Sequence, residues 1–394
     1  MSFWRTLPQP IIGLAPMDGV TDATFRRIVA SQGVPDVTFT EFTNVSEVCR
    51  GPEHLLSSLI YSESERPIVA QLYGKDPDLF YRAAHVVCEL GFDGLDINMG
   101  CPSKNVAASG SGAALIKTPE LAHAIMRAAR QGIEDWAAGQ NLDGLGFKPS
   151  RLEFIRALNL CRAGTPTVAR RVMPLSVKTR LGYEASIVER WVEHLLKERP
   201  VAITIHGRTL QQMYRGGADW SAIAAAASIV RTTDTLILGN GDLNSLADVV
   251  RRIDESRVHG VLVGRGTLGA PWFFRRKDEA RVASRNRQDR ADRQSASWDV
   301  EISVEQRMAL MLDHARQYEA IAGLDRFRSI RKHLGWYCKG FPHAAAMRAR
   351  LFQVSNVRDV ETVIAEFCGE TGIAPPTPAA DRIGFQALSQ SCVP

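Results

Sequence analysis

The sequence predicts an α/β fold, a (β/α)8 TIM barrel, followed by a smaller all-helical C-terminal domain. Short apolar runs rich in β-branched residues alternate with amphipathic helical segments, and eight such units match this barrel in size and in strand pattern. The 394 residues, 45% of them hydrophobic, suffice for two separate cores. The expected strands are Ile11 to Leu14, Val37 to Thr40, Ile68 to Leu72, Gly94 to Ile97, Leu175 to Val177, Ala202 to Ile205, Thr235 to Leu238 and Gly260 to Val263.

Helix-start signals stand between several of these runs. A short polar residue, in two cases followed by proline, opens each helical segment, as expected for capping and for the first helical turn. These signals are Thr21 and Asp22 before 23–31, Asp76-Pro77 before 78–90 and Thr118-Pro119 before 120–130. Strands that alternate with helices form a parallel sheet. A doubly wound sheet is the competing architecture, but Ala15-Pro16-Met17-Asp18 follows the first strand in place of G-x-G-x-x-G.

Two departures from a plain barrel are visible. Residues 275–293 are rich in Arg, Asp, Gln and Ser, which predicts a solvated linker or a frayed helix, and we place the linker over 276–303. That linker would separate a barrel domain at 1–275 from a helical domain and tail at 304–394. An insertion at about 131–172 precedes the fifth strand, so we expect it to emerge as a peripheral helical hairpin from the bottom of the barrel.

Composition narrows the class of protein. No long apolar run is present and the first ten residues include Trp4, Arg5 and two prolines, so we expect no membrane span, no signal peptide and a cytoplasmic location. The seven cysteines form no C-x-x-C pair, which argues against a disulfide framework and against a metal site. The net charge of +5 is only mildly basic, so a polyanionic partner has to be inferred from where the charges lie.

Polar residues stand at the end of nearly every expected strand. In a barrel these ends converge on one mouth, where such folds place their chemistry. Any one of them could simply satisfy loop backbone, but together they predict an active site. They are Met17, Glu41, Gln71, Asn98 with Cys101, Lys178, His206, Asn240 and Gly264.

Two features of these strand ends are specific. Asn98-Met99-Gly100-Cys101-Pro102 places a thiol on a tight turn after the fourth strand, and an isolated cysteine, although usually a small buried hydrophobe, faces a site at this position. Gly239-Asn240-Gly241-Asp242 and Gly264-Arg265-Gly266 follow the last two strands. Glycines there let backbone amides approach a ligand, which predicts a phosphorylated cofactor.

Six motifs together resemble the dihydrouridine synthase family. They are Ala15-Pro16-Met17-Asp18-Gly19-Val20-Thr21-Asp22, Asn98-Met99-Gly100-Cys101-Pro102-Ser103-Lys104, Ser176-Val177-Lys178-Thr179-Arg180, His206-Gly207-Arg208-Thr209, Gly239-Asn240-Gly241-Asp242 and Gly264-Arg265-Gly266. The resemblance covers the barrel and, more loosely, the C-terminal part. It implies an FMN-dependent enzyme that saturates the C5–C6 bond of a uridine in tRNA, with NADPH reducing the flavin.

The same resemblance implies which residues bind the flavin. Those expected along the isoalloxazine ring are Pro16, Met17, Asp18, Gln71, Lys178 and His206. Gln71 would bond the polar edge of the ring and Lys178 would approach N1 and O2. Those expected along the ribityl chain and phosphate are Asn240, Gly241, Asp242, Gly264 and Arg265.

The reaction that the resemblance implies requires an acid. Hydride reaches C6 of the uracil while negative charge develops toward O4, so a proton must reach C5. The resemblance makes Cys101 that donor, and a thiol pKa of about 8.5 keeps it protonated at neutral pH. Lys178 or His206, positively polarised, would favour the anionic reduced flavin. Asn98 would orient the uracil, and Arg208 would bind a substrate carbonyl or phosphate unless it closes the rim as a salt bridge.

The segment 326–350 contains no Asp or Glu and predicts a surface for phosphate. The basic residues expected to contact RNA are Arg326, Arg328, Arg331, Lys332 and Lys339. Trp336, Tyr337 and Phe341 stand among them as stacking partners for bases or as the core of the small domain. Residues 331–337 also resemble the helical RNA-binding domain of the family.

Alternatives to this interpretation remain open at the level of sequence. Ribosomal RNA could replace tRNA as the substrate. An FMN barrel that reduces a free pyrimidine would leave the basic segment unexplained, and an RNA-binding protein with a relict barrel would not need Cys101, Lys178 and His206. We expect a monomer.

Overall fold

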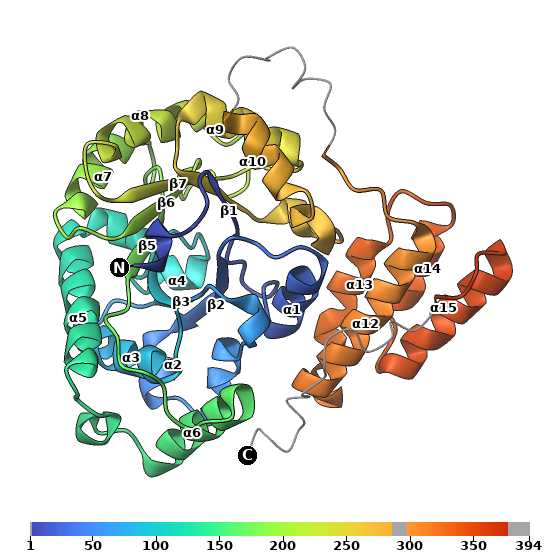
Figure 1. Cartoon of the computed structure of the whole chain (residues 1–394), viewed down its shortest axis with the longest axis horizontal. Coiled ribbons are helices and arrows are strands. Elements are labelled where there is room, and N and C mark those ends of the chain that lie inside the picture. Colours follow the sequence, from blue (N-terminus) through green and yellow to red (C-terminus); the bar gives the residue numbers. More distant parts are fainter. Residues whose placement is uncertain (1, 286–297, 377–394) are drawn as a thin grey trace.

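The computed structural model describes residues 2–285 and 298–376, and it confirms the predicted fold class (Figure 1). Eight parallel strands follow one another around a barrel in the order β1-β8-β7-β6-β5-β4-β3-β2. The Leu14 amide donates to the Val37 carbonyl and the Asp36 amide to the Ile12 carbonyl, which joins β1 to the chain entering β2. The strands are β1 (Ile11–Leu14), β2 (Thr38–Asn44), β3 (Ile68–Tyr73), β4 (Gly94–Met99), β5 (Leu175–Arg180), β6 (Ala202–His206), β7 (Leu236–Asn240) and β8 (Gly260–Val263).

The strands extend further toward the mouth than the apolar pattern indicates. β1 and β8 have the predicted bounds, whereas the other six continue past their predicted ends, β2 as far as Asn44 and β5 as far as Arg180. Most of the added residues are polar, and they still pair with their neighbours, as Asn98 does with Lys178. A polar side chain is compatible with a strand here because it faces a cavity and not the core.

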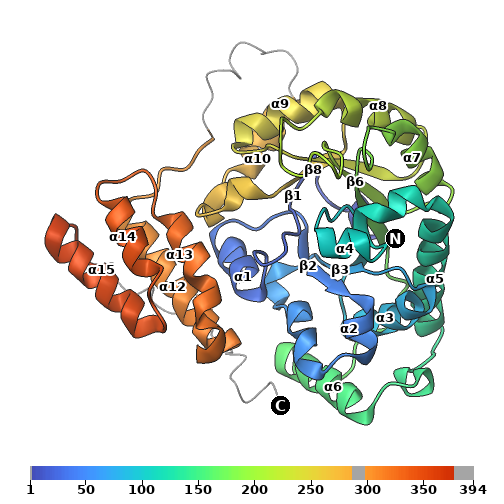
Figure 2. The same cartoon turned by 180° about the vertical axis from the view of Figure 1, so that it is seen from behind.

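Helices surround the strands, and Figures 1 and 2 show this ring from opposite sides. Two of the predicted helix starts have side-chain caps, because Asp22 accepts from the Phe25 amide and Asp76 accepts from the amides of Asp78 and Leu79. The helices of the barrel are α1 (Ala23–Gln32), α2 (Val45–Arg50), α3 (Pro77–Glu89), α4 (Lys104–Ala108), α5 (Pro119–Ala137), α6 (Pro149–Ala163), α7 (Val188–Leu196), α8 (Trp220–Val230), α9 (Leu246–Ser256) and α10 (Lys277–Arg285).

The insertion contributes one full helix, α6, and a short 3-10 turn, η5 (Leu142–Leu145), where we expected a helical hairpin. α6 packs against the 3-10 segment η2 (Glu53–Leu59) that follows β2 and α2. The chain then returns to the bottom of the barrel, where Arg171 pairs with Asp93 at 2.9 Å just ahead of β4. A single helix suffices because the barrel supplies the second surface against which it packs.

Of the two interpretations of the segment after the barrel, the helix holds for the first part of 276–303 and the linker does not. Residues 277–285 form α10, which packs against α9. Its charged side chains are held by the barrel, because Arg281 and Lys277 both pair with the buried carboxylate of Asp36, the latter at 2.8 Å. The polar composition of this segment is therefore compatible with an ordered helix, because Asp36, distant in sequence, neutralises its charges. Residues 286–297 lie outside the described part of the chain.

The C-terminal part forms a helical domain with its own core, which lies beside α1 (Figure 1). Its helices are α12 (Val304–Ala322), α13 (Arg331–Tyr337), α14 (Ala344–Leu351) and α15 (Val357–Thr371). The contact with the barrel includes the ring of Phe25, whose centroid is 5.4 Å from that of His333. The predicted tail beyond residue 376 lies outside the described residues. Within the described ranges no helix is both long and apolar enough to span a bilayer.

Candidate active site

A cavity of about 390 Å³ opens at the mouth of the barrel, and every strand end contributes to its wall. Thirteen of the fourteen predicted catalytic, cofactor and substrate residues line it, as do several that the sequence analysis did not single out. The predicted residues that the structure brings together are Pro16, Met17, Asp18, Gln71, Asn98, Cys101, Lys178, His206, Asn240, Gly241, Asp242, Gly264 and Arg265. Arg208 is absent from the wall, and so is Glu41 of the polar strand ends.

Cys101 lies on the wall with 6% of its surface exposed. Burial raises the pKa of its thiol above the ordinary value, so the thiol stays protonated at neutral pH. Asn98 fixes the turn, because its Oδ1 accepts from the backbone amides of Gly100 at 3.0 Å and Cys101 at 2.8 Å. A protonated thiol on a fixed turn is a proton donor and a poor nucleophile.

Lys178 supplies positive charge to the cavity, and His206 does not. Burial and the neighbouring Arg180 lower the pKa of Lys178 to about 8, which leaves most molecules charged at pH 7. Burial and the surrounding cations, Lys178 first among them, hold the pKa of His206 well below 6.5. His206 is therefore neutral, which corrects the expectation that it could act as a cation beside a flavin.

Arg208 lies behind the wall. It is 2% exposed, and its Nη2 donates to both oxygens of Asp242, at 3.0 and 2.8 Å. Burial acts against ionisation of Asp242, but hydrogen bonds from the Ala218 amide and from Arg208 still lower its pKa. The geometry favours the salt bridge at the rim for Arg208 and gives no support to its predicted contact with substrate.

The glycines of the last two turns leave room for a ligand. Gly241 has a φ of +126°, and a Cβ there would lie 2.7 Å from the Cβ of Ala218 and 3.1 Å from the ring of His206. A Cβ on Gly264 would lie 3.3 Å from the sulfur of Met17, which also lines the cavity. A side chain at either position would fill the cavity wall, so these residues fit a backbone cradle for a phosphorylated group.

Arg180 and Tyr214 also line the cavity, and neither was among the predicted site residues. Arg180 donates through Nε to the Gly100 carbonyl at 2.7 Å and so holds the turn that carries Cys101. Its position two residues after Lys178 on one strand was a usable signal, because alternate residues of a strand face the same side. Tyr214 is 58% exposed on the irregular loop after β6, where no periodicity could reveal it.

The basic residues of the helical domain divide into two groups. Arg326 and Arg328 are exposed. The other three contact the protein itself: Arg331 donates to the Val354 carbonyl at 2.7 Å, Lys339 donates to the Leu268 carbonyl at 3.0 Å, and Lys332 lies against the β1–α1 loop. These three are therefore less available to RNA than predicted.

The aromatic residues of this segment serve mainly as core. Tyr337 is buried and its hydroxyl lies 3.1 Å from Nδ1 of His314, while Phe341 packs edge-on against Phe367. Trp336 is half-buried, and its ring contacts His333. Of the two interpretations given for these residues, the structure favours the core for Tyr337 and Phe341.

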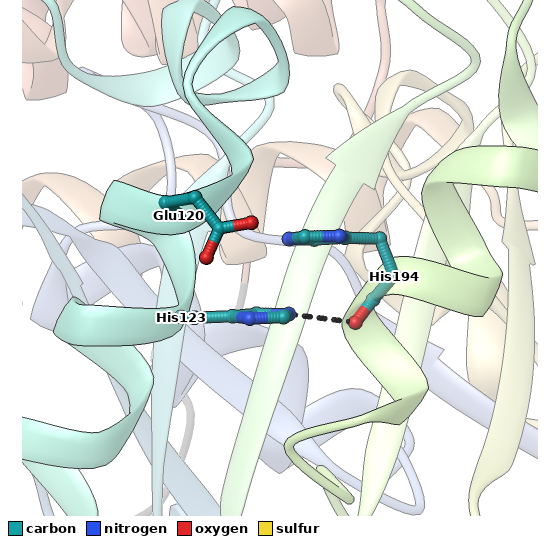
Figure 3. Close-up of side chains that lie close together, drawn as sticks. All are labelled: Glu120, His123 and His194. Atoms are coloured by element: carbon teal, nitrogen blue, oxygen red, sulfur yellow. Dashed lines mark hydrogen bonds between the residues drawn. The ribbon is translucent and has the colours of Figure 1, made fainter.

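Outside the mouth, Glu120 and His123 on α5 approach His194 on α7 (Figure 3). This is a set of metal-ligand side chains, with ligand atoms within 4.8 Å of one another. The two imidazoles, however, stack with centroids 3.7 Å apart and planes 8° apart. Ring lone pairs lie in the ring planes, so nearly parallel rings do not direct them at one ion. His123 instead donates through Nε2 to the His194 carbonyl, and the group joins α5 to α7.

Comparison with known proteins gives the chain a family. The model of the family described as dihydrouridine synthase (Dus) matches residues 13–135 and 158–370, and the gap falls inside the insertion. The chain is 31% identical over 371 residues to the probable tRNA-dihydrouridine synthase 2 of Bacillus subtilis, covering 93% of this chain and 96% of that protein. It is 29% identical to a probable tRNA-dihydrouridine synthase of Staphylococcus aureus, with 93% and 95% coverage. A solved structure of DHODH from Eimeria tenella covers 72% of this chain and 84% of its own, at 13% identity and a TM-score of 0.46. This chain belongs to the dihydrouridine synthase family.

Proposed function

We propose that this protein reduces uridines of tRNA to 5,6-dihydrouridine, with FMN bound in the mouth of the barrel and NADPH as the reductant. The observation that carries the proposal is the meeting, in one cavity, of a protonated thiol at Cys101, a charged amine at Lys178 and the glycine cradle at Gly241 and Gly264. The names of the relatives support tRNA over ribosomal RNA as the substrate.

FMN would lie along the wall between the β1 loop and the cradle. Reduced flavin, when bound, supplies the hydride that saturates the C6 position of a uracil. Asn240, Gly241, Asp242, Gly264 and Arg265 would hold the ribityl chain and phosphate, and Pro16, Met17 and Asp18 would line the ring. Gln71 and Lys178 would contact the polar edge of the ring, and neutral His206 would lie beside it.

The remaining steps fall to side chains of this chain. Cys101 gives its proton to C5 of the uracil, and general acids of this kind contribute about 10²- to 10⁴-fold to a rate. Asn98 and Arg180 hold the turn on which the thiol sits. The target uridine has to leave its stack, at a cost of a few kcal/mol. Contacts between tRNA and exposed residues such as Arg326 and Arg328 would offset that cost.

The test compares dihydrouridine in tRNA from cells with and without the gene, mapped position by position. Loss of the modification at one or more sites, restored by the wild-type gene, is the expected result. Unchanged modification in tRNA would remove the proposal. Purified protein should carry or take up FMN, should oxidise NADPH, and should elute as a monomer in size-exclusion chromatography.

A further inference from the structure

A chain of hydrogen bonds runs from the buried barrel interior to the turn that carries Cys101. Asp96 of β4 accepts from Ser176 Oγ at 2.6 Å and from Gln71 Nε2 at 2.7 Å. Gln71 Oε1 accepts from Asn98 Nδ2 at 2.9 Å, and Asn98 in turn accepts from the amides of Gly100 and Cys101. Asp96 and Gln71 are fully buried, so the hydrogen-bond donors to the Asp96 carboxylate are protein side chains.

The groups at the two ends of this series of hydrogen bonds fix which group donates and which accepts at each contact. An ionised carboxylate can only accept hydrogen bonds, and backbone amides can only donate them. Turning over the side-chain amide of either Gln71 or Asn98 would set donor against donor at one contact and acceptor against acceptor at the other. Such buried mismatches are costly, so both amides hold one orientation. Asp96 anchors the end that lies furthest from the loop.

We propose that Asp96 is a positioning residue for Cys101, acting through Gln71 and Asn98 to hold the Gly100 and Cys101 amides. Its consequence for catalysis rests on the proposed function, but its consequence for the loop does not. A different role is also compatible with burial: Asp96 could act only through its charge on nearby Lys178. The two roles predict different outcomes for two substitutions at the same position.

Asp96→Val removes both the charge and the acceptor while filling most of the space. Asp96→Asn removes the charge alone, because its Oδ1 can still accept from Gln71 while its amide faces Ser176, whose hydroxyl can turn to accept. Ser176→Ala is the matched control, because it removes the other hydrogen bond of Asp96 and leaves the bond to Gln71 in place.

The measurement is hydrogen–deuterium exchange of a peptide spanning 97–106 in flavin-free protein, together with the rate at which iodoacetamide alkylates Cys101. In Asp96→Val we expect exchange of the Gly100 and Cys101 amides at least about tenfold faster than in the wild type, and an altered alkylation rate. Asp96→Asn and Ser176→Ala should stay within about threefold. Equal shifts in the Val and Asn variants, or an unchanged loop in the Val variant, would overturn the proposal.

A second measurement follows uridine reduction in a single turnover with prereduced enzyme and a tRNA transcript. The Val variant should lose at least about tenfold in rate and the Asn variant should recover most of that loss, with tRNA affinity unchanged in both. If the wild type reduces no uridine, the proposed function fails, while the exchange experiment still decides the role of Asp96. If the Val variant does not fold, the milder Asp96→Ser variant replaces it. Faster exchange of the Gly100 and Cys101 amides in that variant is then the expected result, and unchanged exchange would overturn the proposal.

Discussion

The insertion and the barrel mouth each bury arginine side chains, and the two regions use them differently. In the insertion, Arg151 is 3% exposed and donates to the carbonyls of Val48 and Gly51 at the end of α2. At the mouth, Arg180 donates through Nε and Nη1 to loop carbonyls, while its Nη2 has no hydrogen-bond partner within the described residues. Since Arg180 also lines the cavity, its remaining donor can meet a ligand. Burial alone therefore does not distinguish function from structure, whereas unused hydrogen-bonding capacity facing a cavity does.

Cys101→Ala should give the largest effect at the mouth. In the proposed reaction the thiol supplies the proton for C5, so we expect its removal to lower uridine reduction at least about 100-fold. Flavin binding and NADPH oxidation should persist, because neither requires that proton. Dihydrouridine formation in a tRNA transcript, measured beside NADPH oxidation, separates the two.

Cys88→Ala is the matched control, because that thiol is equally buried but lies in α3, away from the cavity. It should lower stability and leave uridine reduction intact. A Cys101→Ala enzyme with full activity on tRNA would show that another group delivers the proton.

Arg151→Met should give the largest effect in the insertion, and on stability alone. The methionine keeps the apolar stem but loses the charged donors, which leaves carbonyls at the end of α2 without their partner. We expect the free energy of unfolding, measured by urea denaturation, to fall by about 2–3 kcal/mol. The kcat for tRNA should not change at urea concentrations at which the variant remains folded. Arg156→Met, exposed on the same helix, should change stability by no more than about 0.5 kcal/mol.

The sequence could predict features that depend on local pattern, but not those that depend on partners distant in the chain. The fold and nearly all of the mouth were accessible, because apolar strands alternating with helices place every strand end at one rim. For Arg208 the sequence left two interpretations open, because its partner Asp242 lies on the next strand end and a sequence does not show which of two neighbouring charges faces the cavity. The packing of α10 on the barrel was not predictable, because its charges are neutralised by Asp36, more than 200 residues earlier in the chain.

Lys178 should make flavin binding depend on pH. Its pKa of about 8 in the flavin-free protein means that the side chain is charged below pH 8 and neutral above it. If FMN binds the charged form, its Kd should stay level from pH 7 to 8 and then rise, by up to about tenfold per pH unit. Fluorescence quenching of FMN across pH 7–9.5 measures this. Lys178→Met should bind FMN more weakly, with a Kd that does not change with pH. Lys178→Arg should still show at pH 9 the affinity that the wild type has at pH 7, because arginine remains charged.

The smallest expected effects lie in the helical domain. Two arginines only three residues apart differ there in whether their hydrogen-bond donors are already used within the protein. Arg328 is exposed, whereas Arg331 donates to the carbonyls of Val354 and Gln353. Arg328→Gln should therefore weaken tRNA binding a few-fold and lower the slope of log K against log salt by about 0.7–0.9, as expected for one lost phosphate contact. Arg331→Gln should leave that slope unchanged and lower the unfolding temperature instead, because its loss frees carbonyls after α14. Filter binding over a range of salt concentrations, with thermal unfolding of the same samples, reads both quantities. Equal slopes for the two variants would mean that the helical domain meets RNA through a face other than the one carrying Arg328.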